Sequence, residues 1–232
     1  MARHTLLTRE RLDGTAVDIE FLLIAVIQGF ALATLAVDAD PIMAGGDWLY
    51  LPYLLAAFIL ILVFWGLAIV HSISFISWPF DLVHTLLYLL VGFVEVSSFS
   101  AIRHPEAWFL FMAGFFVVSG LLYLWDMKMI DERRAEFQDT PARMRLFEHI
   151  RDAQLFEMRF ILAPAVVFQA VVVLLMWQAP DLVLGGNRHL IVVGAQNVFG
   201  LIYLAIIIRS FGTRRKLISD VADDDEARMS AG

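Results

Sequence analysis

The sequence contains no cysteine, so it can form neither a disulfide nor a thiolate metal site, and it has no redox thiol. Charged residues are also scarce, at 18% of 232 residues, against about 25% in an ordinary soluble domain. The sequence lacks a glycine-rich phosphate loop, a His-Glu-x-x-His zinc motif and a nucleophile elbow. We therefore predict a protein that is not an enzyme, with no catalytic residue, no metal and no cofactor.

Hydrophobic residues make up 60% of the chain. A helix needs about 20 mostly apolar residues to cross a bilayer. The stretches of this kind are residues 17–37, 48–71, 80–102, 106–127, 156–178 and 189–210. We therefore predict an all-α, polytopic membrane protein with six transmembrane helices, whose transmembrane domain covers residues 17–210 and whose first partner is the lipid bilayer.

Basic residues are distributed unevenly between the two sides of such a bundle. Every Lys and Arg except Arg103 and Arg188 lies on the side of the termini and of the segment between the fourth and fifth helices. Because basic loops stay in the cytoplasm, both termini and residues 128–155 are predicted to be cytoplasmic, in the cell's inner membrane. An even number of helices agrees with this, since it brings both termini to one side.

Besides the short connections between neighbouring apolar stretches, three longer segments lie outside them: the N-terminal segment (1–16), the 128–155 segment and the tail (211–232). In 128–155, Thr140 caps a new helix that begins with Pro141, which predicts a cytoplasmic helical hairpin. One face of that helix is apolar and could skim the membrane or dock a protein partner. The tail is acidic and is predicted to be disordered. It supplies much of the net charge of −7, so that charge does not indicate a nucleic-acid partner.

The helix predicted at 80–102 carries polar groups at membrane depth. At 100° per residue, His84, Tyr88, Val91, Glu95 and Ser98 share one stripe. A charged group at the bilayer centre costs at least about 2.5–3.5 kcal/mol, so this stripe must face the bundle interior or water. Two interpretations stay open. Glu95 is either protonated and hydrogen-bonded to a neighbouring helix, or it lines a path for an ion or proton.

Other polar side chains lie in the predicted spans. Asp81 stands at a helix start, where the helix dipole favours a negative charge, and His84 could pair with Asp81 or His71. Interhelical hydrogen bonds would account for amide side chains in the first and sixth helices. The complete set of ion-path candidates is Glu95, His84, Gln28, Asp81, Ser98, Gln196 and Asn197.

Small and helix-breaking residues bear on helix shape and packing. Ala25, Gly29 and Ala33 have the small-xxx-small spacing that lets another helix approach closely, and we interpret them as a helix-packing face in a homo-oligomer. Pro164 lies inside the fifth helix and predicts a kink there.

Residues 17–127 resemble a known family. "FILILVFWGLAIVHSISF", a short turn with an Asp, and "FMAGFFVVSGLLYLW" follow one another as in the six-helix bacterial and lysosomal potassium-permeable channels. That family has Phe-Ser-Asp-Gly in its first helix, where this chain has Val26-Ile27-Gln28-Gly29, so the signature itself is absent. The first helix of the family lines the pore, and the resemblance therefore implies that Gln28, Leu32 and Leu35 do so here.

From these features we predict a homo-oligomeric ion channel or small-ion transporter, passing a small inorganic cation. The first alternative is a non-catalytic membrane subunit that docks a partner through residues 128–155. The second is a redox protein that binds haem or quinone. His71 and His84 would serve on the inner side, and His104 and His189 on the outer side.

Overall fold

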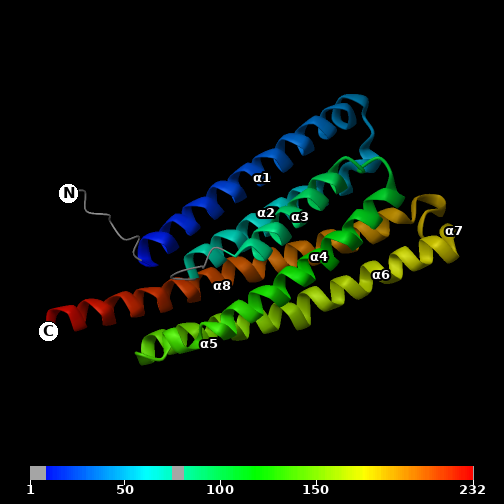
Figure 1. Ribbon diagram of the computed structural model, residues 1–232. Coiled ribbons are helices and arrows are strands. Elements are labelled where there is room, and N and C mark those ends of the chain that lie inside the picture. The colour runs from blue at the N-terminus through cyan, green and yellow to red at the C-terminus, as the bar shows by residue number, and fades with distance from the viewer. Residues whose placement is uncertain (1–8, 75–80, 232) are drawn as a thin grey trace.

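The computed structural model describes residues 9–74 and 81–231, and no strand occurs among them (Figure 1). The long elements are α1 (Arg9–Gly45), α2 (Leu51–Ser74), α3 (Leu82–Phe99), α4 (Pro105–Glu132), α5 (Pro141–Glu157), α6 (Ala163–Gln178) and α8 (His189–Ala231). The short ones are α7 (Pro180–Val183), the 3-10 turns η1 (Trp48–Tyr50), η2 (Arg134–Phe137) and η4 (Gly185–Asn187), and a π-helical segment, η3 (Met158–Leu162).

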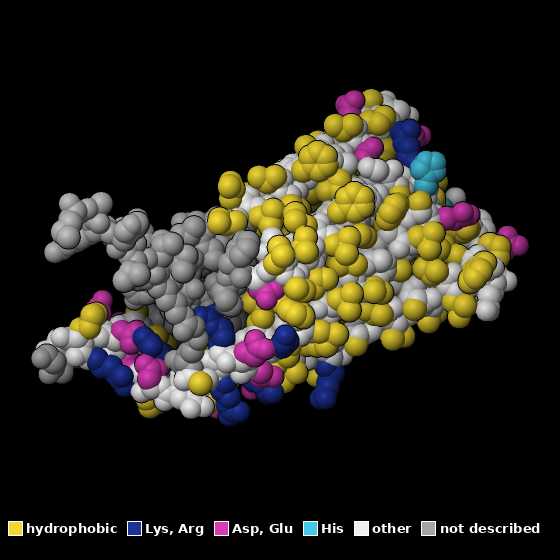
Figure 2. Space-filling view, in the orientation of Figure 1, with side chains coloured by type: hydrophobic (Ala, Val, Ile, Leu, Met, Phe, Trp, Pro, Cys, Tyr) yellow, Lys and Arg dark blue, Asp and Glu magenta, His cyan; other side chains and the backbone are white. Residues whose placement is uncertain are grey.

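Within the described ranges, six helices are long and apolar enough to cross a membrane. Two of them are composite or extended: Pro141–Gln178 joins α5, η3 and α6, and α8 runs well past an apolar first half. Apolar side chains cover the middle of the molecule, while charged side chains gather mainly where α5 and the end of α8 lie (Figure 2). Exposure of so large an apolar surface to water would be unfavourable. The chain is therefore a multi-pass integral membrane protein, as the sequence predicts.

The helices form one bundle in which sequence neighbours are not always packing neighbours. α2 packs against α8, α3 against α4, and α4 against α6, while α1 lies on α2 and α3. The described ends of the chain, Arg9 and Ala231, lie at the same end of the bundle (Figure 1). We call this the termini end, and the opposite one, where α7 lies, the far end. The cytoplasmic location of the termini end is a prediction from the distribution of basic residues.

α1 is longer than the predicted span 17–37, because the helix begins at Arg9 and continues to Gly45. Pro41 lies inside it without ending it. The helix ends at Gly46, whose φ of 71° is open to glycine at no steric cost. The Asp47 amide donates to the Ile42 carbonyl at 3.0 Å and the Gly46 amide to the Met43 carbonyl, a Schellman cap. The glycine pair, rather than the proline, determines where the helix ends.

The predicted irregularity near Pro164 takes the form of a π-helical segment. Met158–Leu162 is wound more loosely than the helices on either side, and the Ala163 amide donates to the Met158 carbonyl five residues back. Proline cannot donate to the carbonyl four residues before it and clashes with that carbonyl. Widening the preceding turn is one way to accommodate both effects.

The acidic tail is helical rather than disordered, which corrects the expectation from its composition. It continues α8, and Val221 is buried in a cluster with Leu146, Phe147 and Ile150 of α5. Arg143 of α5 adds ion pairs to Asp139 and to Asp225 of α8, both at 2.9 Å. The apolar face of α5, expected to skim the membrane or dock a partner, is therefore covered by α8.

Candidate functional site

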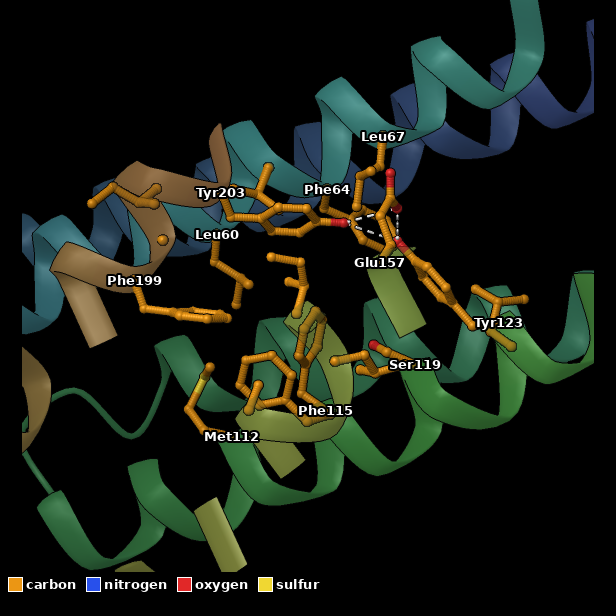
Figure 3. Close-up of a pocket in the computed structure, with 18 of the residues that line it drawn as sticks. Leu60, Phe64, Leu67, Met112, Phe115, Ser119, Tyr123, Glu157, Phe199 and Tyr203 are labelled. Carbon is orange, nitrogen blue, oxygen red and sulfur yellow. Dashed lines mark hydrogen bonds between the residues drawn. The ribbon is translucent and has the colours of Figure 1, made fainter. Parts of the chain in front are cut away.

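A cavity of about 530 Å³ lies inside the bundle (Figure 3). Its walls come chiefly from α2, α3, α4, α6 and α8, and most of them are apolar or aromatic. Leu60, Phe64, Phe115 and Phe199 point into this space in the close-up. Pockets for small ligands span about 300–1,000 Å³, so the space is large enough for an organic molecule. It is the candidate functional site.

The termini end of the cavity carries a buried carboxylate, Glu157, with several partners. Tyr123 donates to its Oε2 at 2.8 Å and Tyr203 at 3.0 Å, and Nη2 of Arg214 lies 3.7 Å from its Oε1. These residues come from α4, α5 and α8, so the cluster joins three helices at one point (Figure 3). Glu157 is 6% exposed and lines the cavity.

A second carboxylate, Asp126, also lines the cavity. Its side chain is 5% exposed, and its Oδ1 lies 3.2 Å from Nε2 of His84. His84 was expected to pair with Asp81 or His71, and the structure adds Asp126 of α4 as a partner. The side chain of His71 lies outside the described residues. No described residue makes a hydrogen bond to Asp126 Oδ1, and its contact with His84 is an ion pair when the imidazole is protonated.

The sequence contains a pattern that indicates the polar residues at the termini end of the cavity. Ser119, Tyr123 and Asp126 stand at i, i+4 and i+7 on α4, which is the same spacing that identified the stripe on α3. All three are buried and line the cavity. Reading every helix for such polar stripes, rather than α3 alone, would have found them. Arg214 carries no such signal, because it lies beyond the apolar part of its helix.

The other end of the cavity is polar too, but neutral. Gln169 of α6 is 1% exposed, and its Oε1 has no hydrogen-bond partner in the described chain. Gln196 of α8, an ion-path candidate, also lines the cavity, and its Oε1 accepts from Trp108 Nε1 at 3.1 Å. Gln169 follows Glu157 by twelve positions, about 18 Å of helix. The cavity is thus a long apolar space with polar groups at both ends.

Glu95 lies in the bundle interior, as its stripe predicts, but outside the cavity. It is fully buried, and Gln28 Nε2 of α1 donates to its Oε2 at 3.0 Å. Ser98 is also fully buried and donates to the Glu95 carbonyl of its own helix at 2.6 Å. Two ion-path candidates, Gln28 and Glu95, therefore bind each other across α1 and α3, which is the arrangement of the first interpretation.

Asp81 has the structural role expected of a charge at a helix start. It is the N-cap of α3: its Oδ1 accepts from the His84 amide at 2.8 Å and from Trp125 Nε1 at 3.1 Å. The hydrogen bond to the amide satisfies one of the unpaired donors of the first helical turn. The bond to Trp125 ties the start of α3 to α4. Asp81 is not among the residues that line the cavity.

Polar groups nearer the far end form hydrogen bonds between helices. Asn197 Nδ2 donates to the Pro52 carbonyl at 2.9 Å, which links α8 to the start of α2. His189 is buried and shares a hydrogen bond of 2.9 Å with the Tyr53 hydroxyl. His104 is exposed. Asn197 thus has the interhelical role that was one of its two interpretations.

Ala25, Gly29 and Ala33 face outward on α1 and do not meet another helix of this chain. All three are exposed, and a Cβ built on Gly29 would meet nothing within 4 Å. They therefore do not form a packing face within one chain. Their contact with a second copy of the chain is still a prediction. Leu32 is exposed, whereas Leu35, like Gln28, is buried against the rest of the bundle.

The cavity lining combines two carboxylates with a mostly apolar wall. The described part of the chain holds no group of three His, Asp or Glu side chains that could bind a metal ion. Neither a family model nor a curated protein nor a solved structure matches the chain. The functional argument therefore rests on the chemistry of the cavity in a multi-pass membrane protein.

Proposed function

We propose that the protein is a cation transporter of the cell's inner membrane, and that the central cavity is its binding chamber. The observation that carries this proposal is the charge of the lining: Asp126 and Glu157 line the cavity, and the described lining residues include no Lys or Arg. Ionisable side chains in membrane spans are costly, and they commonly mark substrate or ion pathways. Glu157 is already engaged by Arg214, so Asp126 is the carboxylate to which we assign the cation.

This proposal places the pathway inside one chain instead of along α1 between copies. The resemblance to potassium-permeable channels implies a pore lined by Gln28, Leu32 and Leu35. Of these, Leu32 is exposed, whereas Gln28 and Leu35 are buried against the chain's own helices. Docking of a partner on α5 also has less support, because α8 covers the apolar face of that helix. Haem or quinone binding stays an alternative, and an absorption spectrum of the purified protein tests the haem case.

Transport by purified protein in liposomes tests the proposal. We expect uptake of cations but not of anions, and we expect Asp126→Asn to lower the rate at least about tenfold, because a hydrogen bond to a charged group contributes about 1.5–3 kcal/mol. The matched control is Asp131→Asn on the same helix. The Asp131 side chain is exposed and pairs with Arg151 at the surface, so its loss should leave the rate nearly unchanged.

Two results would overturn the proposal. One is a folded protein that moves no cation faster than protein-free liposomes do. The other is an Asp126→Asn variant that transports at the rate of the unmodified chain.

A further inference from the structure

The walls of the cavity limit which cations can bind there. A hydrated inorganic ion keeps its water shell unless polar groups replace it, and here most of the lining is apolar or aromatic. The aromatic residues of the lining come from five helices: Phe64, Tyr88, Phe115, Phe116, Tyr123, Phe168, Phe199 and Tyr203. Apolar surface brought out of water contributes about 25 cal/mol per Å². The space therefore favours a ligand with a large apolar body.

Aromatic side chains also favour a positive charge on that body. A cation over the face of an aromatic ring is attracted by about 0.5–2 kcal/mol, more when water is excluded. Phe64 lies within this wall with Tyr88 at 5.0 Å and Phe115 at 6.5 Å between ring centroids, which makes a continuous aromatic surface across α2, α3 and α4. Figure 3 shows Phe64 and Phe115 between the Glu157 cluster and the Phe199 end.

The two carboxylates that line the cavity differ in how many hydrogen bonds and ion pairs they already make within the chain. Both hydroxyls and the guanidinium are bound to Glu157, which leaves it little capacity for another partner. The buried Oδ1 of Asp126 lies 3.2 Å from Nε2 of His84 but accepts no hydrogen bond from any described residue. At the opposite end, the buried Gln169 oxygen has no partner either. The Gln169 oxygen has no donor among the described residues, and the Asp126 oxygen has the His84 contact but no hydrogen bond. An anion can satisfy neither oxygen, whereas a cationic or hydrogen-bond-donating ligand can.

We propose that the chamber binds a lipophilic organic cation, with its positive charge toward Asp126 and its apolar body among the aromatic rings. This inference rests on the proposed function, because it takes the cavity to be the binding chamber and names the class of substrate. It separates organic cations of this type from hydrated inorganic ions, which the apolar walls do not solvate.

A pair of ions of equal shape and opposite charge tests the inference. Tetraphenylphosphonium and tetraphenylborate have the same four aromatic rings, so burial of apolar surface alone would not distinguish them. Binding is measured by equilibrium dialysis on the full chain in lipid nanodiscs, with empty nanodiscs of the same lipid as the control for partition into lipid. We expect saturable binding of the phosphonium and at least about tenfold weaker binding of the borate, a difference of about 1.4 kcal/mol.

Variants then locate the site. Asp126→Asn should weaken phosphonium binding about tenfold, whereas Asp131→Asn should not change it. Phe199→Leu, which keeps the apolar volume and removes the ring, should weaken it by a smaller factor. Equal thermal midpoints for the three variants would show that the loss of binding is not a loss of folding. The comparison of the two ions on the unmodified chain needs no variant at all.

The outcomes separate this inference from the proposed function. Equal binding of both ions, or binding that Asp126→Asn does not alter, overturns the inference. Uptake of potassium or sodium without phosphonium binding overturns it too, but leaves the cation transporter standing. Phosphonium binding that depends on Asp126, without transport of any cation, supports the ligand class and overturns transport.

Discussion

At the scale of single residues, the buried Glu95–Gln28 pair shows how a polar group is kept inside a membrane bundle. The pair has one hydrogen bond of 3.0 Å, and the other oxygens, Gln28 Oε1 and Glu95 Oε1, have no partner among the described residues. Unpaired polar atoms in a dry contact are costly. Gln28 Oε1 could therefore accept a second hydrogen bond if the side chain at position 95 carried a donor.

We predict that Glu95→Gln folds as well as the unmodified chain, within about 0.5 kcal/mol, because two amides can exchange two hydrogen bonds. Glu95→Leu should lower the free energy of unfolding by about 1–2 kcal/mol, since it leaves the Gln28 amide unpaired. Unfolding of both variants in detergent gives the comparison. Cation flux should be the same for Glu95→Gln and the unmodified chain, because Glu95 is outside the cavity; an altered flux would place Glu95 on the path.

The Glu157 cluster is the second residue-scale case, since three helices meet at one carboxylate. Each tyrosine hydroxyl donates to the same oxygen, and the two hydroxyls lie 3.0 Å apart. Removal of one donor leaves Glu157 with the other and with Arg214, whereas removal of both leaves a buried oxygen with no donor.

We predict that Tyr123→Phe and Tyr203→Phe each cost about 1 kcal/mol of stability, and that the double variant costs more than the sum of the two. A double-mutant cycle of thermal unfolding measures this coupling. Purely additive losses would mean that the hydroxyls act independently. Tyr50→Phe, on a half-buried tyrosine outside the cluster, is the control for the loss of a hydroxyl.

At the scale of elements, the end of α8 is a structured part of the protein through its contact with α5. Val221 is 5% exposed in the cluster with Phe147 and Ile150, while the next residue, Ala222, is exposed. The helix in this segment depends on that contact, because isolated helices of this length are marginal in water.

We predict that Val221→Asp frees the end of α8 from α5, because the buried cluster cannot accommodate an unpaired carboxylate. Limited proteolysis should then cut within residues 211–231 much faster than in the unmodified chain. Ala222→Asp adds the same charge one position away, on the exposed side, and should leave the cleavage rate nearly unchanged. Equal protection of both variants would show that α5 does not hold the tail.

At the scale of the whole molecule, the distribution of basic residues predicts on which side of the membrane the termini lie. Both described ends lie at one end of the bundle (Figure 1). The basic residues, apart from Arg103 and Arg188, belong to that side. We predict a cytoplasmic location, so a reporter fused after Gly232 should be active in the cytoplasm only, and activity on the external side would contradict the positive-inside argument.

The outward face of α1 bears on assembly. If Ala25, Gly29 and Ala33 contact a second copy, Gly29→Leu should abolish the oligomer without destabilising the chain, because position 29 faces open space. Size measurements in lipid and in detergent report the oligomer. The control is Gly92→Ala, whose Cβ would come within 2.5 Å of Ile27 Cγ2 and which should cost about 1–3 kcal/mol of stability instead. An unchanged oligomer in Gly29→Leu would show that this face is not an interface.

The sequence by itself determined the class of protein, the number of spans and the inward direction of the α3 stripe. These features follow from the cost of placing polar groups in lipid. The length, hydropathy and helical period of each segment show by themselves whether and how that segment avoids this cost. Asp81 as a helix start is of the same kind, because an N-cap needs only its own backbone neighbours. No contact with a distant segment is needed for any of them.

Only the tertiary structure decided which polar groups meet. Gln28 with Glu95, His84 with Asp126, and Glu157 with two tyrosines and Arg214 each depend on how helices rotate and slide against one another. That register comes from side-chain packing summed over whole interfaces, which no local pattern contains. The same reason explains why the acidic tail is helical: its composition predicts disorder, but α5 provides an apolar surface on which Val221 is buried.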